Sequence, residues 1–245
     1  ISKTNFESLQ IPIPLLEIQK KIISELAGYQ RIIHGCREVI ANYKPIINID
    51  PNWEILKLKD IVLINPQKSE VKGLDQNTTV SFVPMEDLNA NEITFTTSKE
   101  KRLFDVYSKY TYFKDEDVLL AKVTPCFENG KAGIAKGLTS GIGFGSSEFF
   151  VFRPNEKVLP EWIYINLITS EFRKRGVENF TGTSGLRRIP RTFIENYQIS
   201  LPDIKIQHQV IEKIKNEISM IDGNRKLIKI YEEKIQLKIN EVWGI

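Results

Sequence analysis

The chain has 245 residues, of which 41% are hydrophobic and 27% are charged, and its formal net charge at pH 7 is +3. Such a composition is typical of a soluble globular protein with one medium domain or two small ones. No apolar run approaches the roughly 18–20 residues of a membrane-spanning helix. The two cysteines and two histidines are widely scattered, which excludes a zinc-binding spacing and predicts a cytoplasmic protein without a metal or other cofactor.

The chain opens with a short strand pattern followed by a long helix pattern. In "QIPIPLLEIQKKIISEL" (10–26), apolar residues alternate over 10–13 and stop at Pro14, which cannot donate a hydrogen bond to a neighbouring strand. Helical periodicity then runs over about 15–43 and ends before Pro45.

The middle of the chain has the texture of a mixed β domain. From Pro51 to Pro154, short apolar runs such as "TVSFVPM" and "SEFFVFRP" are broken by Gly, Pro, Asn and Asp. The stretch "PEWIYINLITSEFRKRGVENF" (160–180) predicts one helix, with a proline near its start and basic residues in its last turn.

Three polar stretches of this middle region are candidates for ligand contact: "LLAKVTPCFENGKAGIA" (119–135), "GIGFGSSEFFVFRP" (141–154) and "GTSGLRRIPR" (182–191). Glycines and hydroxyls beside clustered Lys and Arg suit contact with DNA phosphates or guanine edges. Turns also collect such residues for purely structural reasons, so the residues by themselves leave both interpretations open. The candidate DNA-binding residues are Lys122, Thr124, Asn129, Lys131, Ser146, Ser147, Thr183, Arg187, Arg188 and Arg191.

The chain closes as it began, with a strand, a proline and a long helix. In "QISLPDIKIQHQVIEKI" (198–214), a strand over 198–201 stops at Pro202, and helical periodicity continues over about 203–242. Apolar residues recur seven apart in two rows, which indicates a coiled-coil seam. The rows are Ile204, Ile211 and Ile218, and Ile214, Ile221, Ile228, Ile235 and Val242.

The two ends form an internal repeat at a constant offset of 188 residues, from Pro14 to Pro202. In this register Gln19 matches Gln207, and the shared residues include Gly, Arg and Tyr as well as apolar positions. Two unrelated amphipathic helices would explain the apolar matches alone. Because neither seam can stay exposed to water, we expect the two helices to pack on each other or on copies from a partner chain.

No catalytic arrangement emerges from the sequence. In "GIGFG" a strand follows the glycines, whereas a dinucleotide loop needs a helix N-terminus there. The nuclease-like pattern of Asp203 with Glu232 and Lys234 places its members far apart along one helix, and metal carboxylates must converge. His34 and His208 both fall on the predicted long helices. We therefore expect a protein that is not an enzyme.

Several segments, in order, resemble the DNA-specificity subunits of type I restriction–modification systems and the specificity region of fused methyltransferase–specificity proteins. They are "LQIPIPLLEIQKKII", "EDVLLAKVTPCFENGKAGIA", "GFGSSEFFVFRP" and "GTSGLRRIPRTFIENYQISLPDIKIQHQVIEKI". The resemblance covers essentially the whole chain. It implies an α+β fold, with one mixed β-rich target-recognition domain flanked by two long helices that pack as an antiparallel coiled coil.

The resemblance also implies a domain plan and a role. Residues 1–14 would be the tail of a preceding recognition domain, 15–50 the first conserved-region helix and linker, 51–201 the target-recognition domain, and 202–245 the second helix. The chain would read one half of a bipartite site in double-stranded DNA. It would dock adenine-N6 methyltransferase subunits and, in a cleaving system, a restriction (nuclease/translocase) subunit. The five Lys and Arg candidates would contact mainly the DNA backbone.

The family pattern contains a second recognition domain that this sequence lacks. The chain would accordingly be a natural half subunit, the C-terminal half of a longer subunit, or an excised domain. A half subunit is expected to pair with itself and restore two recognition domains by two-fold symmetry. A competing hypothesis is a coiled-coil assembly module whose β domain binds protein and does not read DNA.

Overall fold

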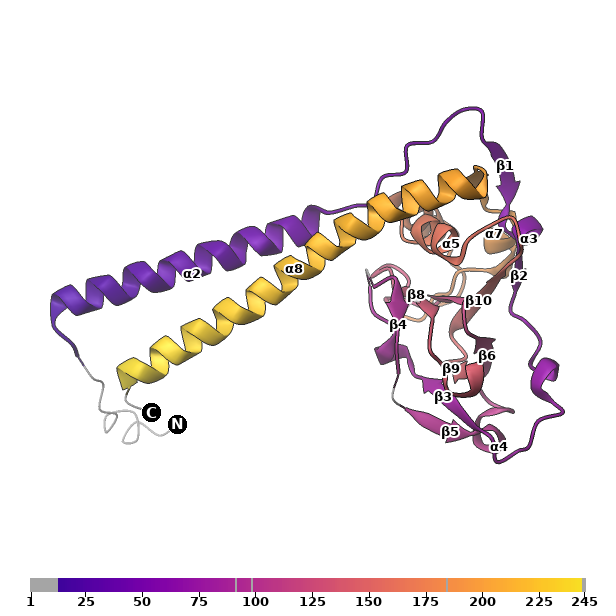
Figure 1. Cartoon of the computed structure of the whole chain (residues 1–245), viewed down its shortest axis with the longest axis horizontal. Helices are drawn as coiled ribbons and strands as arrows, with labels where there is room; N and C mark the ends of the chain where they lie inside the picture. The colour runs from indigo at the N-terminus through magenta and orange to yellow at the C-terminus, as the bar shows by residue number, and fades with distance from the viewer. Residues whose placement is uncertain (1–12, 91, 98, 184, 244–245) are drawn as a thin grey trace. The chain divides into compact units, whose positions relative to one another are not determined.

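The computed structural model describes residues 13–90, 92–97, 99–183 and 185–243. Most of the strand predicted over 10–13 therefore lies outside the described residues. The chain divides into a helical unit, which comprises residues up to Tyr43 and from Ser219 onward, and a β-rich unit, Lys44–Ile218 (Figure 1). No helix of the described residues is long and apolar enough to cross a membrane.

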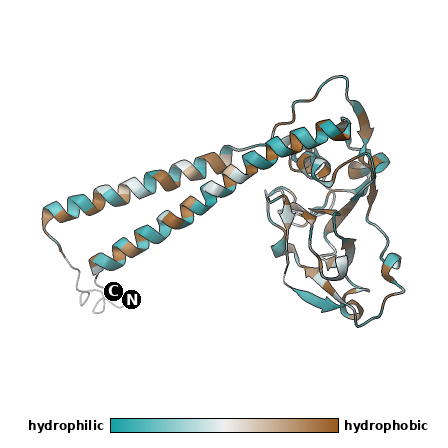
Figure 2. Cartoon of the chain, viewed as in Figure 1, coloured by the Kyte–Doolittle hydropathy of each residue, from teal (hydrophilic) through white to brown (hydrophobic). Residues whose placement is uncertain are grey.

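The helical unit pairs α2 (Leu16–Asn42) with the C-terminal part of α8 (Ile204–Trp243). Figure 2 shows apolar residues recurring along both helices. Contacts run in opposite directions along the two helices: Glu25 pairs with Lys238 (3.4 Å), whereas Arg37 pairs with Glu232 (2.7 Å). The predicted antiparallel coiled coil is thus confirmed.

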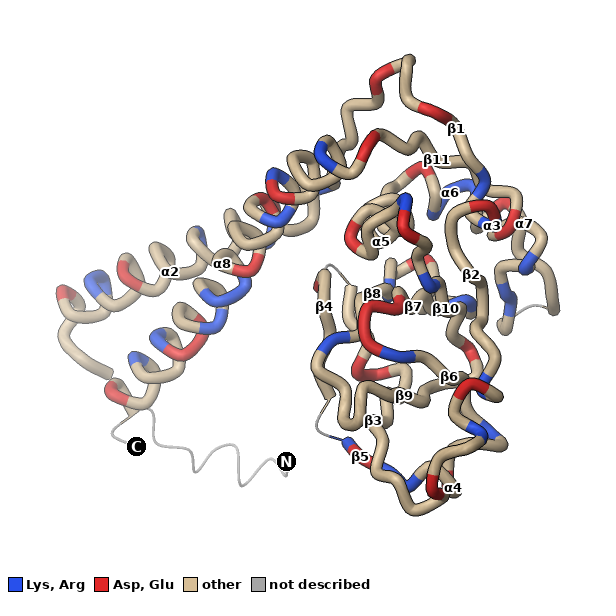
Figure 3. Tube along the Cα trace, turned by 45° about the vertical axis from the view of Figure 1, so that its right-hand side comes forward, with Lys and Arg blue, Asp and Glu red and all other residues tan. Residues whose placement is uncertain are grey.

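Most positions of the heptad rows predicted on α8 are buried or half-buried, whereas Ile204 at the start of the first row is 36% exposed and Gln207, outside the rows, is fully buried. Ile211, Ile214, Ile218 and Ile221 are buried. The second row continues at every seventh position with half-buried Ile228, Ile235 and Val242. Charged residues of both signs alternate along the rest of the helix (Figure 3).

The β-rich unit has the predicted mixed α+β fold. Its described strands form a five-stranded sheet in the order β2–β10–β7–β8–β4, a four-stranded sheet in the order β5–β3–β9–β6, and the pair β1–β11. The strands are β1 (Glu54–Lys57), β2 (Val62–Ile64), β3 (Thr79–Val83), β4 (Thr94–Phe95), β5 (Glu100–Arg102), β6 (Thr111–Lys114), β7 (Val118–Ala121), β8 (Ala132–Ala135), β9 (Ile142–Gly145), β10 (Phe149–Pro154) and β11 (Gln198–Leu201).

Short helices cover the sheets and connect the strands. The α-helices are α3 (Leu58–Ile61), α4 (Leu103–Val106), α5 (Pro160–Leu167), α6 (Ser170–Glu178) and α7 (Arg191–Asn196), and the 3₁₀ turns are η1 (Lys68–Val71), η2 (Met85–Asp87) and η3 (Thr139–Gly141). Helix α5 packs on β7, β8 and β10. These are central strands, and β7 is buried along its whole length, which explains its continuous apolar run.

The single helix predicted over 160–180 is wrong, because the segment forms two helices. The backbone of Thr169 is extended, and its hydroxyl accepts a hydrogen bond from the Phe172 N–H at 3.3 Å, which caps α6. An N-cap threonine satisfies a helix donor that would otherwise lack a partner. The break lets Phe172 pack against Tyr197, with ring centroids 4.8 Å apart.

The core of the β-rich unit lies between the two larger sheets and includes Val83, Phe113, Leu119 and Phe149. The glycines of "GIGFG" serve this packing. A Cβ on Gly143 would overlap the Phe113 ring, and one on Gly145 would meet Phe149 and the Val83 carbonyl. The glycines thus make room for aromatic residues within a strand, in agreement with the rejection of a cofactor loop.

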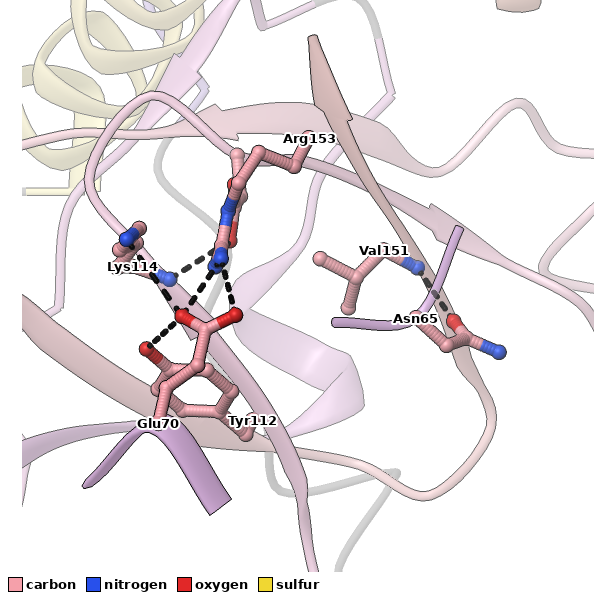
Figure 4. Close-up of polar contacts among 7 residues, drawn as sticks. Asn65, Glu70, Tyr112, Lys114, Val151 and Arg153 are labelled. Atoms are coloured by element: carbon pink, nitrogen blue, oxygen red, sulfur yellow. Dashed lines mark hydrogen bonds and ion pairs between the residues drawn. The ribbon is translucent and has the colours of Figure 1, made fainter. Parts of the chain in front are cut away.

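A charged network ties β10 to η1 and to the β6–β7 turn (Figure 4). The Arg153 guanidinium donates to both oxygens of Asp117, whose side chain is 1% exposed, and to both oxygens of Glu70. Burial raises the pKa of the Glu70 carboxyl, but Arg153 outweighs this and leaves the pKa below its ordinary value. Burial together with the Glu70 carboxylate raises the pKa of Tyr112 to about 12.

Candidate nucleic-acid interface

The three polar stretches lie together in the fold. Main-chain hydrogen bonds join the first stretch to the third: Thr124 N–H donates to the Arg187 carbonyl (3.0 Å), and Ile189 N–H donates to the Lys122 carbonyl (3.0 Å). Lys122 N–H donates to the Glu148 carbonyl at 2.9 Å and so joins the second stretch to the first. Paired backbone holds the three stretches as one surface, the junction surface (122–129, 146–148, 181–183 and 185–188).

Lys122 lies at the centre of the junction surface. Its ammonium donates to the Ser147 carbonyl at 2.7 Å and lies 5.7 Å from the centre of the Phe150 ring. Neither contact neutralises the charge, because a carbonyl and an aromatic face are both neutral groups. Lys122 therefore presents a positioned positive charge.

Arg188 is paired within the chain. Its Nε and Nη2 atoms donate to the two carboxylate oxygens of Glu148 at 2.9 and 2.7 Å. The hydrogen bonds from Arg188 hold the pKa of Glu148 below its ordinary value, and the pKa of Arg188 is raised in turn. This bidentate ion pair joins the second and third stretches. Arg188 therefore stabilises the surface, and its charge is neutralised by Glu148.

Arg187, by contrast, is exposed and lies over an aromatic ring. Its guanidinium carbon is 5.3 Å from the centre of the Phe180 ring, while its backbone N–H donates to the Thr124 hydroxyl at 3.1 Å. No carboxylate pairs with Arg187 within the described part of the chain. Its guanidinium is oriented by stacking, and its five donors are available to an anion.

The other candidates have varied surroundings. The hydroxyl of Ser146 accepts from Glu148 N–H at 3.2 Å and so helps to shape the turn. Ser147, Asn129 and Thr183 are exposed. The contacts of the last two basic candidates lie elsewhere: Lys131 donates to the Met85 carbonyl (3.0 Å), and Arg191 pairs with Glu195 within α7 (2.7 Å).

Sequence reasoning missed the aromatic support beneath this surface. Phe180 contacts Phe127 edge-on, with centroids 5.4 Å apart, and it carries Arg187 on its own ring. The position of Phe180 directly before a glycine-rich basic loop could have indicated this role, since aromatic and basic residues are commonly interleaved in nucleic-acid contacts. Among the described residues, no three His, Cys, Asp or Glu side chains come together in a way that could hold a metal ion.

Comparison with known proteins identifies relatives of one kind. The family model for the type I restriction modification DNA specificity domain matches residues 51–231. The EcoEI specificity subunit of Escherichia coli is 33% identical over 208 residues, covering 81% of this chain and 34% of that protein. The EcoAI specificity subunit of Escherichia coli is 34% identical over 218 residues, covering 85% of this chain and 36% of that protein.

A solved structure supports the fold independently. It comes from a study of complex assembly and conformational transition in a type I restriction–modification system, and it matches with a TM-score of 0.59 at 14% identity. The match covers 99% of this chain and 63% of that one. This chain spans about a third of the length of the two Escherichia coli relatives. The family model nevertheless covers most of the chain. The chain therefore belongs to the type I restriction–modification DNA-specificity family.

Proposed function

We propose that this chain is a non-catalytic subunit that recognises one half of a bipartite sequence in double-stranded DNA and docks adenine-N6 methyltransferase subunits. The observation that carries the proposal is the junction surface, because backbone pairing brings Lys122 and Arg187 together without a carboxylate partner for Arg187. Family membership supports the same role. The β-rich unit would be the recognition domain.

The roles on the junction surface follow from its contacts. Lys122 and Arg187 would bind phosphates, since ionised donors bind phosphate oxygens with short, strong hydrogen bonds. Exposed Asn129, Ser147 and Thr183 would lie nearer the bases, because amide and hydroxyl groups can read base edges. Arg188 would hold the loops in place through Glu148.

The helical unit would provide the protein-docking surface. Its exposed apolar residues include Met220, Leu227 and Leu237, and exposed apolar patches are typical of protein-binding surfaces. Methyltransferase subunits, and a restriction subunit in a cleaving system, are the partners that we propose. The same residues favour the competing hypothesis of an assembly module without DNA readout.

The internal repeat supports a place for a second recognition domain. Gln19 and Gln207 each donate to the carbonyl of the proline five residues earlier, at 2.7 and 2.9 Å. In the β-rich unit, Ile211 is 2% exposed, whereas its counterpart Ile23 on α2 is 65% exposed. We propose that the first turns of α2 seat another domain of the same fold, supplied by a second copy of this chain or by a longer polypeptide. Light scattering on the purified chain distinguishes a dimer from a monomer.

A binding titration separates DNA recognition from protein assembly. We expect the chain, together with its methyltransferase subunit, to bind a labelled duplex with an affinity that falls steeply as salt increases. The exchange Arg187→Ala should weaken binding to every sequence to a similar degree. Undiminished duplex binding in Arg187→Ala would remove this residue from the interface. Absence of duplex binding by the assembled complex would favour the assembly module.

A further inference from the structure

Arg173 lies beside the junction surface, and its side chain occupies a space that Gly130 leaves open. A Cβ built on Gly130 would be 2.8 Å from the Arg173 Nη1 atom and 3.5 Å from its Cζ atom. Gly130 also has a φ of +72°, a conformation that side chains disfavour. Helix α6 thus directs this guanidinium against the turn that carries Asn129.

Arg173 differs from the other half-buried arginines of the unit in lacking an anion. Arg153 binds Asp117 and Glu70, and Arg188 binds Glu148. Among the described residues, the Arg173 guanidinium has no hydrogen-bond or ion-pair partner, and its titratable neighbour is Tyr164. A phenol is uncharged at neutral pH. Burial lowers the pKa of Arg173, which is the expected result of removing water from an unpaired cation.

An unpaired charge at such a position costs folding free energy. Replacing a charge of this kind with an apolar side chain of similar length often leaves stability unchanged or raises it. Contacts among the described residues therefore do not account for a positive charge at Arg173, and its guanidinium is available to an anion from outside the chain.

We propose that Arg173 binds a phosphate of the DNA backbone at the turn 126–130, as a positioning contact next to the junction surface. The inference rests on the proposed function, and it adds a residue that fixes the duplex against the loop carrying Lys122 and Asn129. A guanidinium can bind two phosphate oxygens at once, which suits a contact that sets register. The contact would be independent of base identity.

The test compares Arg173→Met with Arg175→Met in the full chain assembled with its methyltransferase subunit. Arg175 lies on the same helix but is exposed and paired with Glu171 at 2.7 Å, so it is a matched control for loss of one positive charge. The probe is a random-sequence duplex of about 30 base pairs, titrated from roughly 50 to 200 mM NaCl. Melting temperatures of all variants are recorded alongside.

For Arg173→Met we expect the Kd to rise about tenfold, which is typical of losing one charged hydrogen-bonded contact. The slope of log affinity against log salt should become shallower by about one, and the melting temperature should stay the same or rise. Arg175→Met should change the Kd by less than about twofold. An unchanged affinity and an unchanged salt slope in Arg173→Met would overturn the Arg173 contact but not the proposed function. A loss of binding accompanied by a lowered melting temperature would also overturn the contact, because unfolding would explain it. A wild-type complex that binds no duplex at any salt would remove the proposed function as well.

Discussion

The exchange Gln207→Leu tests how the loop 157–159 is joined to the start of α8. Gln207 is fully buried. Its amide oxygen accepts from Leu159 N–H at 2.9 Å, and its amide nitrogen donates to the carbonyls of Lys157 and Pro202, both at 2.9 Å. Leucine has nearly the same volume but makes none of these hydrogen bonds, so three backbone groups lose a partner.

Each buried backbone group left without a partner costs about 1–3 kcal/mol. Because some of the three can turn to water, we expect Gln207→Leu to lower the free energy of unfolding by about 3–5 kcal/mol. The equivalent exchange Gln19→Leu is the matched control. Gln19 makes one such bond, to the Pro14 carbonyl, and is half-buried, so its replacement should cost about 1 kcal/mol.

Urea unfolding followed by tryptophan fluorescence measures both effects. The buried Trp162, which contacts Trp53, reports on the β-rich unit, and Trp243 at the end of α8 reports on the helical unit that contains Gln19. Equal losses in the two variants would refute the reasoning, because they would mean that the hydrogen bonds of Gln207 to the 157–159 loop contribute nothing.

Three further predictions concern the charged residues of the β-rich unit. Arg187→Ala should weaken duplex binding without changing the melting temperature. Arg188→Ala should lower both the affinity for duplex DNA and the melting temperature, because it leaves Glu148 unpaired. Identical behaviour of the two variants in binding and melting assays would contradict these roles. Arg153→Met should lower the free energy of unfolding by about 3–5 kcal/mol, because it leaves the buried Asp117 carboxylate without its cation; a loss below about 1 kcal/mol in urea titrations would disprove this. The folded-state pKa of Glu148 lies below its unfolded value, so this carboxylate stabilises the fold above about pH 4.3 and the stability is lost as pH falls through the lower, folded pKa. We therefore expect a stability decline on acidification that is smaller in Glu148→Gln, and an equal decline in both proteins would count against it.

Periodic features of the sequence predicted the helices well. The heptad rows on α8 match the buried residues from Ile211 onward but not at exposed Ile204, and α2 ends three residues before Pro45, as expected. The division of 160–180 was missed because the apolar residues Trp162, Ile165, Ile168 and Phe172 keep a helical spacing across the break. At the break the backbone of Thr169 is extended and its hydroxyl caps α6, and the contact of Phe172 with Tyr197 arises only in the tertiary structure.

The sequence indicated which residue types form the candidate interface, but it did not indicate which of these residues contact one another. Lys122, Arg187 and Arg188 stood out by composition, yet nothing local indicates that Arg188 is neutralised by Glu148, forty residues away, while Arg187 is not. Arg173 was read as a helix-end charge, because its relation to Gly130 arises only when α6 packs on the 122–130 loop. Pairing between distant loops depends on tertiary structure, and sequence periodicity does not report it.

Selection of bound duplexes from a random DNA pool, with the methyltransferase subunit present at moderate salt, tests sequence recognition directly. We expect a recovered motif with two fixed half-sites separated by a fixed gap. Identical inverted halves would identify a pair of copies of this chain, and unlike halves a second, different recognition domain. A confirmed complex that enriches no sequence would contradict DNA recognition and would leave the helical unit as the functional part of the chain.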